Sequence, residues 1–174
     1  MTAVLLGLAG CGLTRPDVDP DQRRLVQPLV HDALIAQMKR EGGMLTQDEK
    51  HLRPQWFCSE DIIEIAGADD GQSLTVGLLA VCQEYGKRGG ALVTGTGMAT
   101  PWITELRKDA TGRYRVTSQD SPPDGGGYVT WIERHFSEAG AEHVRDGDQE
   151  LSREVEAAAR RHFGVAEDAP VEDL

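Results

Sequence analysis

Positive charge is scarce in this sequence of 174 residues, which has 18 Lys and Arg against 29 Asp and Glu. The resulting net charge of -11 repels phosphate backbones, so we expect no nucleic acid among its partners. An acidic domain also gains no attraction from anionic lipid headgroups. Any attachment to a membrane must therefore come from a feature other than surface charge.

Long apolar runs are missing as well. A membrane-spanning helix needs roughly 20 consecutive apolar residues, whereas the longest apolar run near the N-terminus extends only from Ala3 to Ala9. Hydrophobic residues make up 39% of the chain, which is enough for one soluble domain with its own core. The sequence therefore predicts a single domain rather than a membrane-spanning protein.

The sequence patterns of common enzymes and metal sites are absent too. None of the five histidines lies in a His-Glu-x-x-His pattern, no serine lies in Gly-x-Ser-x-Gly, and no Cys-x-x-Cys occurs. The Gly95-Thr96-Gly97 stretch lacks the lysine of a phosphate loop and lies in a strand-like segment, which is typical of a bulge or bend. We expect no catalytic residues, no metal site and no cofactor.

The short apolar run ends in Leu8-Ala9-Gly10-Cys11, which resembles the lipobox of bacterial lipoproteins. The resemblance implies a signal peptide over residues 1–10, cleavage before Cys11, and lipid on Cys11 that holds the protein at the extracytoplasmic face of the cell membrane. A signal peptide opens with basic residues, and none precedes Arg15. We interpret residues 1–10 as a truncated signal peptide whose translation start lies upstream, and residues 11–20 as a lipidated tether.

The remaining periodicity predicts an α+β domain over residues 21–164 and a disordered acidic tail over 165–174. An apolar helical stripe runs through Leu25, Leu29, Leu34 and Met38, in a helix that either begins at Pro28 or is kinked there. A polar loop over 44–55 precedes four antiparallel strands over about 55–66, 73–85, 91–108 (broken at Pro101) and 113–119. Two C-terminal helices follow, the first with an aromatic stripe at 128–136 and the second at 148–163. We expect helices to cover one face of the sheet.

This layout is similar to cystatin-like and NTF2-like α+β domains. A looser similarity to uncharacterised extracytoplasmic domains of bacteria rests on a Gly-x-Gly-x-x-x-Pro strand, a Pro-x-Asp-Gly turn and an aromatic helix. The matching residues are Gly95, Gly97, Pro101, Pro122, Asp124, Gly125, Tyr128, Ile132 and Phe136. These are turn and core residues, so the resemblance implies a fold and no chemistry.

Two cysteines remain once Cys11 is assigned to lipid. Around a three-residue turn at 69–71, directly opposed residues have numbers that sum to 140, as those of Cys58 and Cys82 do. Opposed residues in a non-hydrogen-bonded pair lie roughly 4.5 Å apart, within reach of a disulfide. Export would place the pair in a compartment where disulfides form. We predict a Cys58–Cys82 bridge, with two buried free thiols as the alternative.

The aromatic residues offer one candidate pocket. Trp56, Tyr85 and Trp102 could line the concave side of a curved sheet, or they could simply fill the core. The carboxylates Glu60, Asp61 and Glu64 alternate with isoleucines and are expected to face solvent.

Three functions fit these patterns. The first is a non-enzymatic lipoprotein that binds a protein or a small ligand. The second is an envelope enzyme with a carboxylate and a histidine as acid and base. The third is a structural or regulatory lipoprotein without a pocket, which binds its partner through an exposed face of the sheet.

Replacing Cys11 tests the lipobox. The Cys11→Ser variant should lose membrane association or stay uncleaved, because serine has no thiol to take the diacylglycerol. Membrane fractionation and electrophoretic migration measure both effects. The matched control is the Cys58→Ser, Cys82→Ser double variant, which keeps Cys11 and should stay on membranes. A Cys11→Ser variant that fractionates and migrates like the natural protein would show the lipobox to be wrong.

Overall fold

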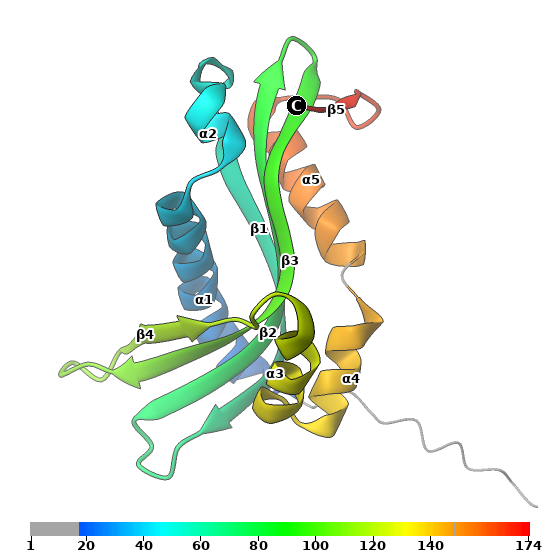
Figure 1. The fold of residues 1–174 in the computed structure, drawn as a ribbon. Coiled ribbons are helices and arrows are strands. Elements are labelled where there is room, and N and C mark those ends of the chain that lie inside the picture. Colours follow the sequence, from blue (N-terminus) through cyan, green and yellow to red (C-terminus); the bar gives the residue numbers. More distant parts are fainter. Residues whose placement is uncertain (1–17, 148) are drawn as a thin grey trace, which may run out of the picture.

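The computed structural model describes residues 18–147 and 149–174, which form one sheet between two layers of helices (Figure 1). The order of elements confirms the predicted α+β class, and none of the helices in the described part of the chain is both long and apolar enough to cross a membrane. In chain order the elements are α1 (Pro20–Glu41), α2 (Met44–Asp48), η1 (Lys50–Leu52), β1 (Gln55–Gly67), β2 (Ser73–Arg88), β3 (Ala91–Lys108), β4 (Tyr114–Asp120), η2 (Gly125–Gly127), α3 (Tyr128–His135), α4 (Glu138–Asp146), α5 (Gln149–Phe163) and β5 (Val171–Asp173).

The sheet contains the four predicted strands as an antiparallel series in the order β1-β2-β3-β4. Several finer expectations were wrong. A fifth strand, β5, pairs with β3 in parallel; α4 is an additional helix; and α2 and η1 occupy the predicted loop. Pro101 does not break β3, because no strand of the described residues pairs with it on its outer side, and proline is tolerated at such an edge.

Helix α1 covers one face of the sheet with a stripe of four residues that are at most 2% exposed: Val26, Val30, Leu34 and Met38. Leu25, expected in that stripe, is 50% exposed. Leu34 follows Leu25 by nine positions, which is about two and a half helical turns, so these two side chains point in opposite directions. Pro28 lies inside the helix without ending it.

Helices α3, α4 and α5 cover the opposite face, so the expectation of one covered face was wrong (Figure 1). The aromatic stripe predicted for α3 is present, since Trp131, Ile132 and Phe136 belong to this second core. Leu151 and Val155 of α5 complete it. The middle of the sheet is therefore buried on both sides, and little of its flat surface is left for a partner.

The predicted disulfide between Cys58 and Cys82 is present, with a Cα–Cα distance of 4.1 Å. The predicted turn was wrong, because Ala68 N–H donates to Ser73 O and the four residues 69–72 form the turn between this pair. A β-bulge between Ile62 and Glu64 takes up the extra residue. Opposed residue numbers sum to 141 between the turn and the bulge, and to 140 beyond it, so Cys58 faces Cys82.

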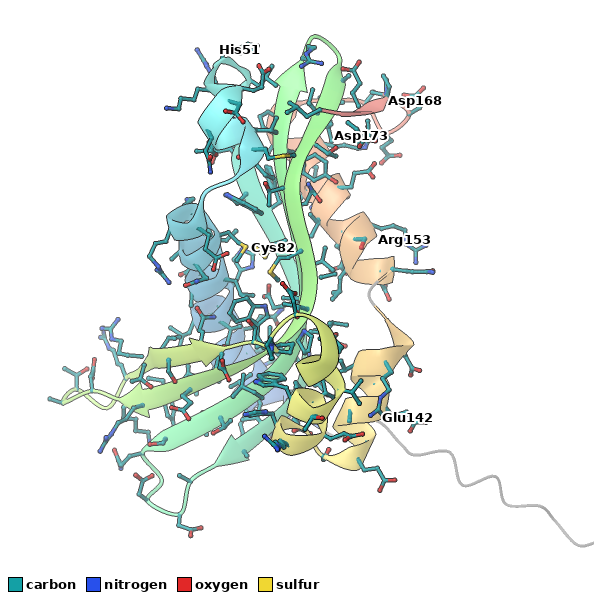
Figure 2. All side chains as sticks on the ribbon, in the orientation of Figure 1. His51, Cys82, Glu142, Arg153, Asp168 and Asp173 are labelled. Carbon is teal, nitrogen blue, oxygen red and sulfur yellow. A yellow bond between two sulfur atoms is a disulfide. The ribbon has the colours of Figure 1, made fainter. Side chains whose placement is uncertain are left out.

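The C-terminal segment is ordered, which corrects the prediction of a disordered acidic tail. Leu92 N–H donates to Pro170 O at 3.1 Å, and β5 continues along β3 from there. Two of the acidic side chains have partners: Glu172 lies 3.2 Å from Arg88, and Asp173, which is labelled in Figure 2, accepts a hydrogen bond from the Thr94 hydroxyl. Strand pairing and these contacts hold a segment whose composition alone indicated disorder.

Glu84 on β2 is a fully buried carboxylate that the sequence analysis overlooked. It accepts hydrogen bonds from the backbone N–H groups of Leu45 at 2.9 Å and Thr46 at 2.7 Å. These N–H groups lie in the first turn of α2, where no helix carbonyl can accept from them. A Cβ atom at Gly43 or Gly95 would lie within 2.5 Å of this carboxylate. The glycine at 95 therefore makes room for a buried charge, consistent with the bulge there.

Removal of the Glu84 carboxylate should destabilise the domain. We expect Glu84→Ala to lower the free energy of unfolding by about 3 kcal/mol, because it leaves buried N–H groups without an acceptor. Urea unfolding followed by circular dichroism measures this value. Glu142, on the outer side of α4 (Figure 2), gives the matched control, and Glu142→Ala should change stability by no more than about 0.5 kcal/mol. Equal effects of the two substitutions would contradict the capping role.

Candidate functional site

A cleft of about 380 Å³ runs along β1, an edge strand of the sheet. Helix α1 borders it on one side, and α4 and α5 border it on the other. Its lining residues are Gln27, Ser59, Glu60, Asp61, Leu79, His143, Gly147, Glu150, Leu151 and Glu154. All three layers of the fold therefore contribute to one site.

Asp61 connects the two helical layers at this edge. Its Oδ2 lies 2.8 Å from Nε2 of His143 on α4, and its Oδ1 lies 3.5 Å from Nη1 of Arg23 on α1. The second guanidinium nitrogen of Arg23 donates to Ile62 O at 2.7 Å. The Asp61 and His143 side chains are about one quarter exposed, so the pair is open to the cleft.

Glu60 makes a second pairing with a histidine. Its Oε2 lies 3.0 Å from Nδ1 of His31 on α1, and the Glu60 side chain is only 3% exposed. This hydrogen bond raises the pKa of His31, against the lowering effect of partial burial, and the charges of Glu60 and Asp32 add to the increase. Each of the two consecutive carboxylates thus holds a histidine from a different helix.

The cleft lacks the relay of a serine hydrolase. Ser59 donates its hydroxyl hydrogen to Glu154 of α5, whereas His143 pairs with Asp61. A nucleophilic serine needs the histidine as its base, and here the serine and the histidine have different partners. The described residues also contain no cluster of three or more His, Cys, Asp or Glu that could hold a metal ion.

The three aromatic residues of the candidate pocket do not share one face of the sheet, so they form no common pocket. Trp56 and Trp102 lie in the core beneath α1, whereas Tyr85 lies in the core on the opposite face. All three are less than 10% exposed. Burial raises the pKa of Tyr85 to about 12, and the indole N–H groups of both tryptophans have no hydrogen-bond partner in the described part of the chain. These residues fill the core.

The three carboxylates expected to face solvent have partners instead. Glu60 and Asp61 hold the two histidines, and Glu64 accepts a hydrogen bond from the hydroxyl of Ser137 at 2.7 Å, next to the start of α4. Cys11 lies outside the described residues. The pairing of His31 and His143 with these carboxylates could not be predicted from sequence spacing, because the partners are 29 and 82 residues apart in the chain.

Comparisons with known proteins identify no family. No family model matches the chain, and no curated protein matches it. Among solved structures, the chain is similar to the intermembrane space region of the chloroplast protein ARC6, with 12% identity and a TM-score of 0.36 over 61% of this chain and 98% of that one. A likeness at this level is too low to identify a shared function.

The pairing of His31 with Glu60 should be visible in its titration. We expect the pKa of His31 to lie above its ordinary value of 6.5 and to fall in Glu60→Gln, which removes the carboxylate. Because the folded-state pKa is raised, the stabilisation is fully present below about pH 6.5 and is lost as the pH rises through the folded-state value. NMR titration of the imidazole signals measures the pKa, and thermal unfolding of natural protein and His31→Gln across this range measures the stabilisation. Asp61→Asn is the control and should leave the pKa of His31 high; an unchanged value in Glu60→Gln would contradict the pairing.

Proposed function

We propose that this protein is a membrane-anchored extracytoplasmic lipoprotein whose domain binds a cationic ligand or partner group, without chemical change, in the cleft along β1. The lipobox at Leu8 to Cys11 supports the anchor. The Cys58–Cys82 disulfide supports an oxidising compartment, which is where the lipobox would deliver the domain.

The observation that carries the binding proposal is the charge of the cleft. Four carboxylates line it: Glu60, Asp61, Glu150 and Glu154. The lining includes one histidine and neither Lys nor Arg. A concave site with one sign of charge attracts ligands of the opposite sign, and a partly enclosed site strengthens that attraction.

Binding fits the contacts better than catalysis does. The hydroxyl of Ser59 and the imidazole of His143 already interact with carboxylates. Glu150, by contrast, forms no hydrogen bond or ion pair with the described residues, and this exposed carboxylate on α5 is available to a ligand. The cleft therefore offers acceptors and negative charge, with no activated nucleophile.

One observation favours an envelope enzyme as the second candidate. The Asp61–His143 pair, at 2.8 Å, opens into the same cleft, and a carboxylate that orients an imidazole is a common arrangement for acid–base catalysis. Conversion of a bound compound into a new product, abolished by His143→Gln, would favour this candidate over binding alone.

Titration of the full chain with triarginine tests the binding proposal. We expect saturable changes in the amide NMR signals of the cleft, absent with triglutamate. The Glu150→Gln, Glu154→Gln double variant should bind triarginine about tenfold more weakly, since two exposed charge pairs are each worth up to about 1 kcal/mol.

The Glu138→Gln, Glu142→Gln double variant is the matched control, because it removes the same charge from α4 outside the cleft lining. It should bind triarginine like the natural chain. Equal weakening in both double variants would attribute the binding to net charge and contradict a site in the cleft.

A further inference from the structure

The outer edge of β3 has an open stretch between two paired segments. On this side, β5 pairs with Leu92–Thr94 and β4 pairs with Ile103–Lys108 (Figure 1). Residues 95–102 lie between these segments and have no strand partner there within the described part of the chain. The sheet is thus interrupted in the middle of its longest strand.

Strand geometry shows which backbone groups face this gap. Lys108 N–H donates to Gln72 O, toward β2, and the pairing of β2 with β3 is regular from residue 107 back to residue 97. Because backbone groups alternate along an antiparallel strand, those of Met98 also point toward β2, and those of Gly97, Ala99 and Pro101 point outward. Gly97 and Ala99 are exposed, whereas Pro101 is buried.

Pro101 fits the same geometry. Proline has no N–H, and its position in β3 directs the missing group toward the open side, where no strand requires it. Two N–H donors and two carbonyl acceptors, those of the exposed residues Gly97 and Ala99, therefore face the open side of the edge. Such a row of unpaired groups is a template for another strand.

A cavity of about 610 Å³ lies beside this edge. It is lined by Glu41, Met98, Ala99, Thr100, Trp102, Ser121, Pro122, Pro123, Asp124 and Tyr128. The Gly-x-Gly-x-x-x-Pro strand and the Pro-x-Asp-Gly turn of the sequence thus meet at one place. The lining carries two carboxylates, Glu41 and Asp124, and neither Lys nor Arg.

We propose that an extended peptide segment of a partner protein, carrying basic side chains, adds as a strand to β3 over Gly97–Ala99 in the gap between β4 and β5. The backbone groups of the edge supply the hydrogen bonds, and Glu41 and Asp124 select basic side chains. This site goes beyond the proposed function, because the carboxylate–histidine cleft lies along β1, on the other side of β2.

Charge argues against a second copy of this chain as the occupant. Pairing of two identical β3 edges would bring Glu41 and Asp124 of one chain toward the same residues of the other, and each chain has a net charge of -11. Like charges brought together oppose association. A basic segment gains attraction from the same carboxylates.

The experiment uses the ¹⁵N-labelled full chain and a seven-residue peptide of alternating Val and Lys with blocked ends. We expect saturable binding and amide hydrogen exchange at Gly97 and Ala99 that slows at least about tenfold, because strand pairing protects both N–H groups. A peptide of the same sequence in which the backbone nitrogens of the lysines are methylated should give no protection of these two N–H groups. A peptide with Glu in place of Lys should give none either.

Two substitutions test the edge itself. Ala99→Pro removes an outward N–H, as Pro101 already does, and should abolish protection at Gly97, whereas Ala99→Val keeps the N–H and should bind normally. Asp124→Lys, on an exposed turn, should weaken binding of the Lys peptide and strengthen binding of the Glu peptide, which decides the matter if Ala99→Pro fails to fold.

Several results would overturn the proposal. They are equal binding of the N-methylated peptide, signal changes confined to the cleft along β1, and protection of Gly97 and Ala99 in a peptide-free dimer detected by sedimentation. Changes confined to the cleft would support the proposed function while refuting strand addition. If triarginine fails to bind but the Lys peptide adds as a strand, the strand-addition proposal would stand and the proposed function of the cleft would be refuted.

Discussion

The register between β1 and β2 is the constraint on which the rest of the molecule depends. Helices cover both faces of the sheet, so each face accepts only one set of side chains from β1. A shift of one residue would exchange the sets and send Ile62 and Ile63 to the wrong cores. The disulfide at Cys58–Cys82 fixes this register covalently, and the bulge near Ile63 lets the four-residue turn coexist with it.

The same register places the carboxylates of the cleft. Glu60 and Asp61 are consecutive on an edge strand, so one turns toward α1 and meets His31, while the other reaches His143 on α4. A carboxylate that is buried without partners carries a high cost in free energy. At the edge, each carboxylate joins a helix to the sheet and still borders the cleft.

The positions of both proposed binding sites follow from the three-layered arrangement. With the central faces of the sheet occupied by α1 on one side and α3 to α5 on the other, the backbone and side chains available to partners lie at the margins. The cleft uses the outer side of β1, and the open stretch uses the outer side of β3. Glu84 supports this arrangement from inside, because its buried carboxylate holds the start of α2 against β2.

The sequence by itself determined the α+β class, the strands and helices with clear periodicity, and the Cys58–Cys82 pair. The class and the elements depend on local alternation, so nearby residues contain the information. The cysteine pairing rested on a three-residue turn, and it holds because the bulge between Ile62 and Glu64 offsets the extra residue of the real turn. Tertiary structure alone decided the second covered face, the strand formed by the acidic tail, and the burial of Trp56, Tyr85 and Trp102. It also decided the pairing of Glu60 and Asp61 with histidines far along the chain. The reason is physical: local patterns set which way a side chain points along its own element, whereas its partner is set by how distant elements pack, and no spacing in the sequence records that.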